Sequence, residues 1–373
     1  MNTKLGHIVA TALLAASTMT MGASTAVAQN LQYGNYLPPS HPTNAYALTP
    51  LFDAVREESD GKLNVILQAG GALVGVKDTL SGIATGLVDG GFIVSIFVPN
   101  EIPLNTTLSD LAMLIEDPVT MVGALNETVL LDCPACLEEY QDHNVTYLGA
   151  HSTTAYSLMC QEPVKTLSDI QGLKIRSSSD VYGRWLNEIG GVPVSVSVSE
   201  AYEAMQRGLL DCVYGSVGWL KSMSLWDVSK HVLRQESGGF GGGALIAFNT
   251  DTWDGMSDES RSMIVDRVPG ALARLAVGYI TEDEAAVQEA SERGVMVNGK
   301  DPEISALLAE YQKSEVELAV AKAGERGAEG AQQLVDAYIE NLKKWKKISA
   351  ETGGDVTLIE EALRREIYSK LDL

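Results

Sequence analysis

The stretch TLSDIQGLKIRSSSD (residues 166–180) places an arginine at the end of a short apolar strand. Leu173 and Ile175 alternate with Lys174 and Arg176, which is the period-two pattern of a half-buried strand. Arg176 stands where this strand gives way to a serine-rich loop. Because ligands of α/β proteins usually bind at that end of a strand, Arg176 is the first candidate binding residue.

Strands and helices alternate along the chain on both sides of this stretch. Before it, the pattern predicts helices at 44–59 and 76–86 among strands at 31–37, 63–68 and 90–98. Beyond residue 145 the alternation restarts and continues to residue 216. Strands that alternate with helices of this length indicate βαβ units and a largely parallel sheet. Two such sets in one chain predict an α/β fold with two lobes.

The N-terminus, MNTKLGHIVATALLAASTMTMGASTAVAQN, has the features of a secretory signal. One lysine precedes an apolar run at 8–16, and an A-x-A cleavage site at 26–28 precedes Gln29. No cysteine precedes Cys133, so we expect no lipid on the mature N-terminus. No later apolar run approaches the roughly 18 residues that a membrane span needs. We therefore expect a soluble, periplasmic protein without stable membrane insertion.

The charge of the chain is strongly acidic. It has 27 lysines and arginines against 49 acids, a net charge of −22, and cleavage of the signal removes Lys4 but no acid. Such a surface repels nucleic acid and anionic membranes, so we expect neither as a partner. To bind a small anion, a chain of this charge needs a local site with a basic side chain.

The four cysteines are Cys133, Cys136, Cys160 and Cys212. Export to an oxidising compartment favours two disulfides, and four cysteines allow three pairings. We expect Cys133 to pair with Cys136, which leaves Cys160 and Cys212 on strands of one lobe to face each other. An alternative reading of DCPAC (132–136) is a thioredoxin-like redox pair. However, a catalytic C-x-x-C opens a helix directly after a buried strand, whereas this one interrupts a helical run.

No metal or cofactor site is expected. The other two cysteines lack paired spacing, and the five histidines are scattered. The glycine run GGFGGGA (238–244) lacks the lysine and hydroxyl residue of a phosphate loop, and its place between the lobes suits a flexible hinge. His41 could face the mouth of a cleft, but the prolines around it favour a capped turn.

Several motifs around Arg176 resemble the solute-binding proteins of TRAP transporters, the DctP-like family. That family has a D-x-x-G-L-K-I-R strand, a helix, a G-A-x-P-V strand and then S/E-x-Y-x-A-L-Q-x-G-x-V-D-G. This chain matches these motifs at residues 172–176, Pro193, Val194, Glu200, Tyr202, Ala204, Gln206, Gly208 and Asp211. The segments DGKLNVILQAGGALVG, GLVDGG and NTDTWDGMSDESRSMI are similar too, so the resemblance covers nearly all of the mature chain.

The resemblance implies two α/β lobes with a ligand cleft between them, crossing strands and a long bracing helix. After a signal peptide at 1–28, we expect lobe I at 29–153 and 242–281. Lobe II is expected at 154–241 and 282–373, together with the C-terminal helices. The implied function is capture of a small mono- or dicarboxylate and its delivery to TRAP membrane permease subunits, without catalysis and as a monomer.

Arg176 occupies the position of the family arginine that grips the ligand carboxylate. A guanidinium presents a planar fork that binds a carboxylate through two hydrogen bonds, and it stays charged. The alternative role for Arg176 is a structural ion pair with one of the many acids. The motifs around it favour the ligand role.

The chain departs from the family at other contact positions. A second arginine found in sialic-acid-binding relatives falls near Tyr156, and Val94 and Ser95 stand where an acid often follows the GGFIV strand. The family's D-G-x-E-N/W loop is replaced by DCVYGS (211–216). The remaining candidate ligand-binding residues are Tyr36, Ser95, Tyr156, Tyr214, Gly215 and Trp219, with Ser216 as a further alternative. One cation among hydroxyls and aromatic rings favours a small monocarboxylate, or a dicarboxylate whose far end is hydrogen-bonded.

Other functions are compatible with parts of the sequence. A periplasmic thiol–disulfide oxidoreductase would use Cys133 and Cys136, and a periplasmic hydrolase is a further enzyme class. The chain has no G-x-S-x-G elbow and no histidine-rich cluster to support hydrolysis. A ligand-sensing co-receptor of a sensor kinase would use the same fold and cleft.

Overall fold

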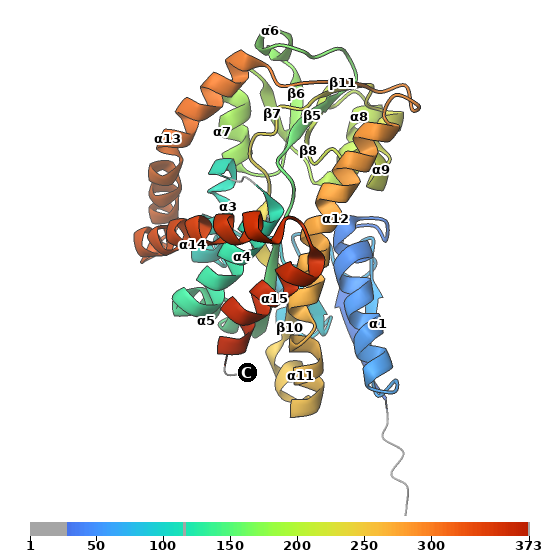
Figure 1. The fold of residues 1–373 in the computed structure, drawn as a ribbon, viewed down its shortest axis with the longest axis vertical. Helices are drawn as coiled ribbons and strands as arrows, with labels where there is room; N and C mark the ends of the chain where they lie inside the picture. Colours follow the sequence, from blue (N-terminus) through green and yellow to red (C-terminus); the bar gives the residue numbers. More distant parts are fainter. Residues whose placement is uncertain (1–27, 115–116, 372–373) are drawn as a thin grey trace, which may run out of the picture.

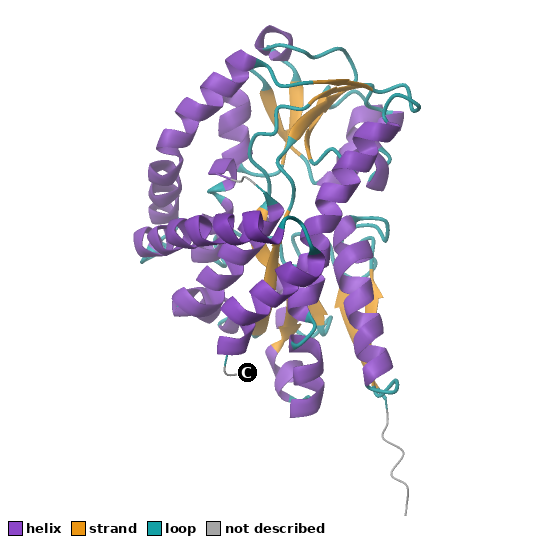
Figure 2. Ribbon diagram, viewed as in Figure 1, coloured by secondary structure: helices purple, strands orange, loops and turns teal. Residues whose placement is uncertain are grey.

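The computed structural model describes residues 28–114 and 117–371, so the expected signal at 1–28 lies almost wholly outside the described residues. Two separate sheets, each covered by helices, form two lobes that follow one another along the long axis of the molecule (Figure 1, Figure 2). This arrangement confirms the predicted two-lobe α/β fold. Within the described residues, no helix is both long and apolar enough to cross a membrane.

The first lobe is built on a sheet of five strands: β1 (Gln29–Gly34), β2 (Leu63–Gln68), β3 (Gly90–Gly91), β4 (Val145–Ser152) and β10 (Gly241–Asn249). They lie in the order β2-β1-β3-β10-β4. β1 runs parallel to β2 and β3, whereas β10 runs antiparallel to β3 and β4. Every residue of β10 is buried, so this late strand is an interior strand of the first lobe, between β3 and β4.

Short helices cover the first sheet. They are η1 (Thr43–Leu48), α1 (Thr49–Glu58), α2 (Thr79–Ala84), η2 (Ser95–Phe97), α3 (Pro103–Ser109), η3 (Ala112–Leu114), α4 (Pro118–Glu127), η4 (Thr128–Asp132), α5 (Pro134–Gln141), α10 (Thr250–Asp254) and α11 (Asp258–Val265). The predicted helix at 44–59 corresponds to η1 and α1, which follow one another directly. The predicted strand at 63–68 has the bounds of β2.

The second lobe has a sheet of six strands: β5 (Ser157–Cys160), β6 (Lys174–Ser177), β7 (Val192–Ser195), β8 (Cys212–Gly215), β9 (His231–Leu233) and β11 (Met296–Asn298). Their order is β11-β9-β5-β8-β6-β7, and β6 runs parallel to both β7 and β8. The helices are α6 (Leu167–Ile170), α7 (Asp180–Glu188), η5 (Val198–Glu200), α8 (Ala201–Gln206), α9 (Trp219–Ser222) and η6 (Leu225–Asp227). Arg176 therefore lies on an inner strand of this sheet.

Helix α12 (Val268–Glu289) runs from the first lobe to the second (Figure 1). Its N-terminal part packs against η1 and β4. Near its C-terminal end, Asp283 Oδ1 accepts hydrogen bonds from Ser216 Oγ at 2.7 Å and from the Gly218 backbone N–H at 2.6 Å. Because these groups belong to the second lobe, α12 is the long bracing helix that the family resemblance implies.

Helix α13 (Pro302–Glu325) makes a second connection between the lobes. At its start, Gln235 Nε2 donates to Ser305 Oγ at 2.9 Å, which ties it to the second lobe. Further along, Gln312 Nε2 donates to the Met113 carbonyl oxygen at 2.6 Å, on the first lobe. A change in the angle between the lobes must therefore also move or bend α13.

The C-terminal elements are α14 (Ala331–Thr352), α15 (Val356–Glu366) and η7 (Tyr368–Lys370). Trp345 Nε1 donates to Glu127 Oε2 at 2.7 Å, and its ring fills the space above Gly123 on α4. Tyr368 OH donates to the Leu148 carbonyl oxygen of β4 at 2.8 Å. The sequence-based boundaries group residues 282–373 with lobe II, whereas these contacts attach the last helices to the first lobe. The reason is the close fit of the indole against a helix that carries no side chain at that point.

Two extended segments cross side by side between the lobes. The Thr153 N–H donates to the Phe240 carbonyl oxygen at 2.8 Å, and the Tyr156 N–H donates to the Gly238 carbonyl oxygen at 2.9 Å. The glycine run expected to form a hinge starts in this crossing region. Its later part, Gly241–Ala244, is buried in β10 and belongs to the first sheet.

The strand predicted at 90–98 is much shorter in the structure. β3 ends at Gly91, and η2 begins at Ser95. After the pairing of Gly90 with Phe248, contact with β10 continues only as an isolated bridge between Ile93 and Ala244. The apolar run therefore reflects burial between elements and not a long strand.

Both expected disulfides are present, and no described cysteine is free. Cys133 is the N-cap of α5, and it bonds to Cys136 in the first turn. Cys160 and Cys212 lie directly opposite each other on β5 and β8. The Cys133–Cys136 pair follows η4, a helical segment, so the buried strand that precedes a catalytic C-x-x-C is missing here.

Candidate functional site

A narrow cavity of about 40 Å³ lies between the two lobes. Its walls come from both lobes, both crossing segments and α12. The lining residues are Tyr36, Leu37, His41, Phe92, Val94, Ile96, Phe97, His151, Thr153, Tyr156, Arg176, Ser178, Val198, Trp219, Phe240 and Tyr279. Arg176 is the only lysine or arginine among them, and none is an acid. The cavity is thus an apolar, largely aromatic space with a single permanent charge.

Arg176 is held at the cavity by neutral groups of its own lobe. Its Nε donates to the Val196 carbonyl oxygen at 2.9 Å, and its Nη1 donates to the Tyr214 carbonyl oxygen at 3.2 Å. β6 lies between β7 and β8, so carbonyl groups that follow or belong to these neighbouring strands come within reach of the guanidinium. These bonds fix the orientation of Arg176 without neutralising it.

No described carboxylate forms an ion pair with Arg176, although its side chain is only 3% exposed. Burial lowers the pKa of Arg176, while the nearby phenols of Tyr156 and Tyr36 raise it. An arginine remains protonated at any physiological pH. Since a buried charge without a counter-charge is unfavourable, Arg176 has the properties of an anion-binding residue more than those of a structural ion pair.

Aromatic rings surround the guanidinium. The ring centroid of Tyr156 lies 5.4 Å from that of Trp219, and the Arg176 guanidinium lies 5.6 Å from the Trp219 centroid. On the other lobe, the ring of Tyr36 stacks with the ring of Phe92, and their centroids are 5.9 Å apart. Of the residues proposed from the sequence, Arg176, Tyr36, Tyr156 and Trp219 are therefore brought together at one cavity.

Three other proposed residues do not line this cavity. Tyr214 OH points to the crossing segment and donates to the Ser237 carbonyl oxygen. Ser95 Oγ is hydrogen-bonded to Ser109 Oγ at 2.7 Å. Gly215 has no side chain, and a Cβ there would come within 2.1 Å of the Trp219 ring, so its role is to let the indole pack.

Ser216, the further alternative from the sequence, is also used structurally. Besides its bond to Asp283, its hydroxyl lies 2.8 Å from Thr154 Oγ1. The segment after β8 therefore contributes Trp219, the first residue of α9, to the cavity, whereas the Ser216 hydroxyl binds Asp283 of α12.

The cavity also includes residues that the sequence reasoning did not select. His41 and His151 are both buried. The centroid of each imidazole ring is about 6.1 Å from the centroid of the Tyr279 ring. The expected capped turn at His41 is present, because Nδ1 accepts from the Thr43 backbone N–H at 3.3 Å. The same residue lines the cavity. No local pattern marks His151 or Tyr279, which reach the site through the packing of β4 and α12.

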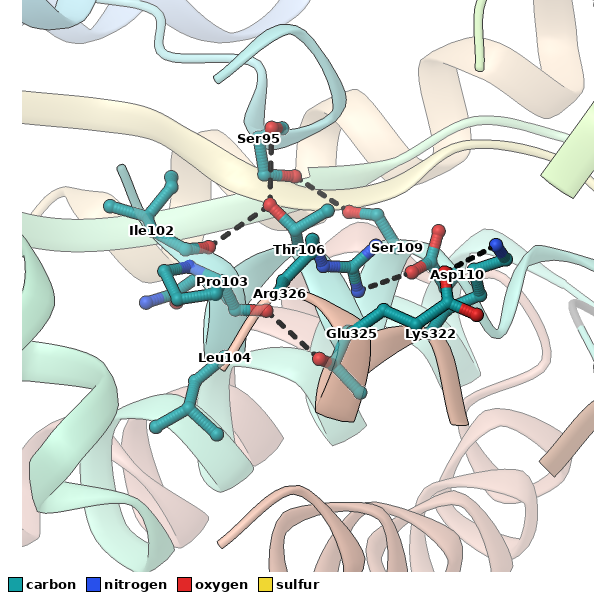
Figure 3. A network of polar contacts seen from close by, with 12 residues as sticks. Ser95, Ile102, Pro103, Leu104, Thr106, Ser109, Asp110, Lys322, Glu325 and Arg326 are labelled. Carbon is teal, nitrogen blue, oxygen red and sulfur yellow. Dashed lines mark hydrogen bonds and ion pairs between the residues drawn. The ribbon is translucent and has the colours of Figure 1, made fainter. Parts of the chain in front are cut away.

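A more polar hollow of about 410 Å³ adjoins the cavity and shares Ile96, Phe97 and Ser178 with it. Arg326, just after α13, pairs there with Asp110 at 2.5 Å, and both side chains are largely buried (Figure 3). Figure 3 also shows Thr106 Oγ1 hydrogen-bonded to the carbonyl oxygen of Ser95. This hollow forms the outer part of the space between the lobes, and four of its charged side chains form the ion pairs Arg326–Asp110 and Lys322–Glu325.

Comparison with known protein families identifies the chain. Residues 33–317 match the DctP model, described as bacterial extracellular solute-binding protein, family 7. The chain belongs to this family. The match confirms the resemblance to TRAP solute-binding proteins, and the family consists of solute-binding receptors and not of enzymes. Family 7 membership also explains the two sheets, the crossing segments and the bracing helix.

Individual relatives of this family 7 protein are distant in sequence. It is 23% identical to a solute-binding protein of Chromohalobacter salexigens over 297 residues, 78% of this chain and 84% of the relative. It is similar in fold to a marine metagenome TRAP solute binding protein specific for aromatic acid ligands, in complex with 3-hydroxybenzoate. That match has a TM-score of 0.75 at 20% identity and covers 86% of this chain and 99% of the other.

A third similar structure is a TRAP periplasmic solute binding protein from Bordetella bronchiseptica with bound (R)- and (S)-mandelate. Its TM-score is 0.72 at 21% identity, with 85% of this chain and 99% of the other covered. At this level of identity, the structural matches establish the fold of the family 7 protein.

Proposed function

We propose that this protein is the periplasmic receptor subunit of a TRAP transporter and that it binds a small monocarboxylate through Arg176. The observation that carries the proposal is the buried guanidinium of Arg176, which lies between the lobes without a described carboxylate partner. A ligand carboxylate would supply the missing charge and two parallel hydrogen bonds. The bound acid is delivered to the membrane permease subunits.

Ligand binding and lobe closure are coupled in this proposal. The cavity is small, and residues of both lobes enclose it. A ligand therefore enters when the lobes part, and the closed form excludes water from the ion pair with Arg176. Because electrostatic interactions strengthen as water is excluded, closing on an anion is favourable, whereas closing on a neutral molecule leaves the charge unpaired.

The character of the walls favours a monocarboxylate with an apolar body. One lining cation can neutralise one carboxylate, and a second would be buried without a counter-charge. Phe92, Phe97, Tyr156, Trp219 and Phe240 line the cavity with aromatic side chains, which suit a flat or apolar ligand. The aromatic-acid and mandelate complexes of two structural neighbours are consistent with this choice.

A thermal-shift screen of the mature protein tests the proposal. The panel contains benzoate, mandelate and lactate as monocarboxylates, succinate and malate as dicarboxylates, and neutral sugars and amines of similar size. A ligand at 100 times its dissociation constant adds about 2.7 kcal/mol to stability, which is readily measured. We expect a monocarboxylate to raise the melting temperature most. Stabilisation by sugars or amines alone would overturn the proposal.

A further inference from the structure

We infer that His41 and His151 form a second polar contact of the ligand site, on the first lobe, for an uncharged hydrogen-bonding group of the ligand. This inference rests on the proposed function, because it concerns the end of the ligand opposite its carboxylate. The expected ligand is thus a monocarboxylate that carries a hydroxyl or oxo group.

The two histidines lie across the cavity from the arginine. His41 belongs to the turn before η1 and His151 to β4, both on the first lobe, whereas Arg176 belongs to β6 of the second. The Trp219 ring is within 6.3 Å of the His41 ring centroid and within 5.6 Å of the Arg176 guanidinium. Arg176 and His41 therefore lie near the same indole, and both line the same cavity. A single small molecule in this cavity can contact both.

The hydrogen bonds of His41 determine which ring nitrogen carries its proton. The Thr43 backbone N–H donates to Nδ1 at 3.3 Å, and Thr43 Oγ1 lies 2.9 Å from the same nitrogen. An amide N–H can only donate, so Nδ1 acts as the acceptor and the proton of the neutral ring is on Nε2. Nε2 is buried and has no hydrogen-bond partner in the described structure. Nε2 is therefore a buried hydrogen-bond donor without an acceptor.

His151 also has an unpaired ring nitrogen, and it lines the same cavity. Its Nδ1 is buried and has no partner among the described residues, and its ring packs between Phe92 at 5.0 Å and Phe240 at 5.5 Å. Buried polar groups in proteins nearly always have partners, and leaving one unpaired is unfavourable. Two unpaired imidazole nitrogens on residues that line one cavity therefore indicate a ligand group that hydrogen-bonds there.

The charge state of the histidines selects the kind of group. Burial lowers the pKa of both His41 and His151 to about 3, and for His41 the proximity of His151 contributes. Both rings are therefore neutral near pH 7. Neutral imidazoles can hydrogen-bond a hydroxyl or a carbonyl oxygen, but they do not supply the positive charge that a second buried carboxylate requires.

Isothermal titration calorimetry on matched pairs of acids tests the inference. The pairs are benzoate with 3-hydroxybenzoate, phenylacetate with 3-hydroxyphenylacetate, and butyrate with 4-hydroxybutyrate, and each pair differs by one hydroxyl group that is remote from the carboxylate. In at least one pair we expect the hydroxylated acid to bind about tenfold more tightly, as a buried donor finds its partner. His41→Asn keeps an acceptor near Thr43 but does not reach the Nε2 position, so the preference should disappear.

A second variant and a control complete the test. His151→Phe suits the aromatic packing around that ring and should also reduce the preference, which covers the case that His41→Asn fails to fold. His143→Asn, on the loop after α5 and outside the cavity, should retain it. Equal binding of both members of every pair, or a preference that persists in both variants, overturns the inference and leaves the proposed function intact. If no carboxylate binds, the proposed function itself fails.

Discussion

The guanidinium of Arg176 lies 5.6 Å from the centre of the Trp219 ring, so the only permanent charge at the cavity faces an indole. Carbonyl oxygens hold two of its nitrogens, and the aromatic ring covers it. All of these neighbours are neutral and belong to the same lobe. Arg176 is therefore held in place for an anion before any ligand arrives, which reduces the entropic cost of forming the ion pair.

Arg176→Ala is expected to lower ligand affinity by two to three and a half decades. Removing one partner of a buried ion pair costs about 3–5 kcal/mol, and a decade of affinity corresponds to about 1.4 kcal/mol. Arg176→Lys keeps the charge but loses the planar fork, so it should also weaken binding substantially. Calorimetry with the acid found in the screen measures both variants.

The unliganded form of Arg176→Ala should be nearly as stable as the wild type, because removal of a buried, unpaired charge offsets the loss of the hydrogen bonds to the Val196 and Tyr214 carbonyl oxygens. Arg207→Ala is the matched control, since this arginine of the second lobe is 69% exposed and pairs with Glu203. Unchanged affinity together with a large fall in the melting temperature would show that Arg176 serves the fold and not the ligand.

Gly215→Ala should disturb the site without touching the ligand. Its Cβ would lie 2.1 Å from the Trp219 ring, so the indole must shift and carry part of the cavity wall with it. Overpacking of this kind costs about 1–3 kcal/mol. We expect this loss in urea denaturation, together with weaker ligand binding. Gly299→Ala, where a Cβ meets no atom within 4 Å, is the control, and equal stability of the two variants would contradict the prediction.

The two disulfides should differ in their contribution to stability. Cys160 and Cys212 are 52 residues apart in sequence, whereas Cys133 and Cys136 are separated by 3. By the loop-closure entropy of the unfolded chain, these separations correspond to about 4 and about 2 kcal/mol. Replacing each pair by alanines and measuring urea denaturation tests the difference. An equal or larger loss for the Cys133–Cys136 pair would refute it.

Glu315 on α13 should make the stability depend on pH. Its Oε1 accepts from the Met113 N–H at 3.4 Å, its Oε2 has no described partner, and burial raises its pKa from 4.5 to about 7. Between these values the folded state binds more protons than the unfolded state, so stability falls as pH rises. The loss is at most about 3 kcal/mol and is complete above about pH 7.

Glu315→Gln removes this titration, because glutamine resembles the protonated acid at every pH. Relative to the wild type, the variant should gain stability in urea denaturation between pH 5 and pH 8. Glu310→Gln, which changes an exposed side chain of the same helix, should show no such relative gain. If the difference in unfolding free energy between Glu315→Gln and the wild type is the same at pH 5 and pH 8, Glu315 is not the titrating group.

Local patterns predicted the parts of the fold that depend on local interactions. The alternation of apolar residues fixed β2 at 63–68, and the turns and helix lengths indicated two α/β units. Arg176 was found because it ends a recognisable strand. The strand predicted at 90–98 failed, because an apolar run signals burial and burial does not require a strand partner.

The site was only partly predictable, because local patterns do not show which distant segments pack together. The sequence made Tyr214 and Tyr156 equal candidates for ligand binding. In the structure, Tyr214 points toward the crossing segment, whereas Tyr156 lines the cavity. His41, His151 and Tyr279 come from three distant parts of the chain, and no spacing links them. Which side of a strand faces the second lobe depends on how the two sheets are placed.

The sequence by itself determined the α/β class, the family and the place of Arg176 at the end of a strand, since strand periodicity, motif order and side-chain chemistry are properties of the chain. It allowed three disulfide pairings, and the pairing of Cys160 with Cys212 was decided by their facing positions on β5 and β8. The tertiary structure alone decided that Arg176 lacks a described acidic partner, and that two buried histidines with lowered pKa values line the same cavity. It also attached α14 to the first lobe through Trp345. Burial and pairing depend on which distant segments pack together, and that packing is settled by the free energy of the whole fold.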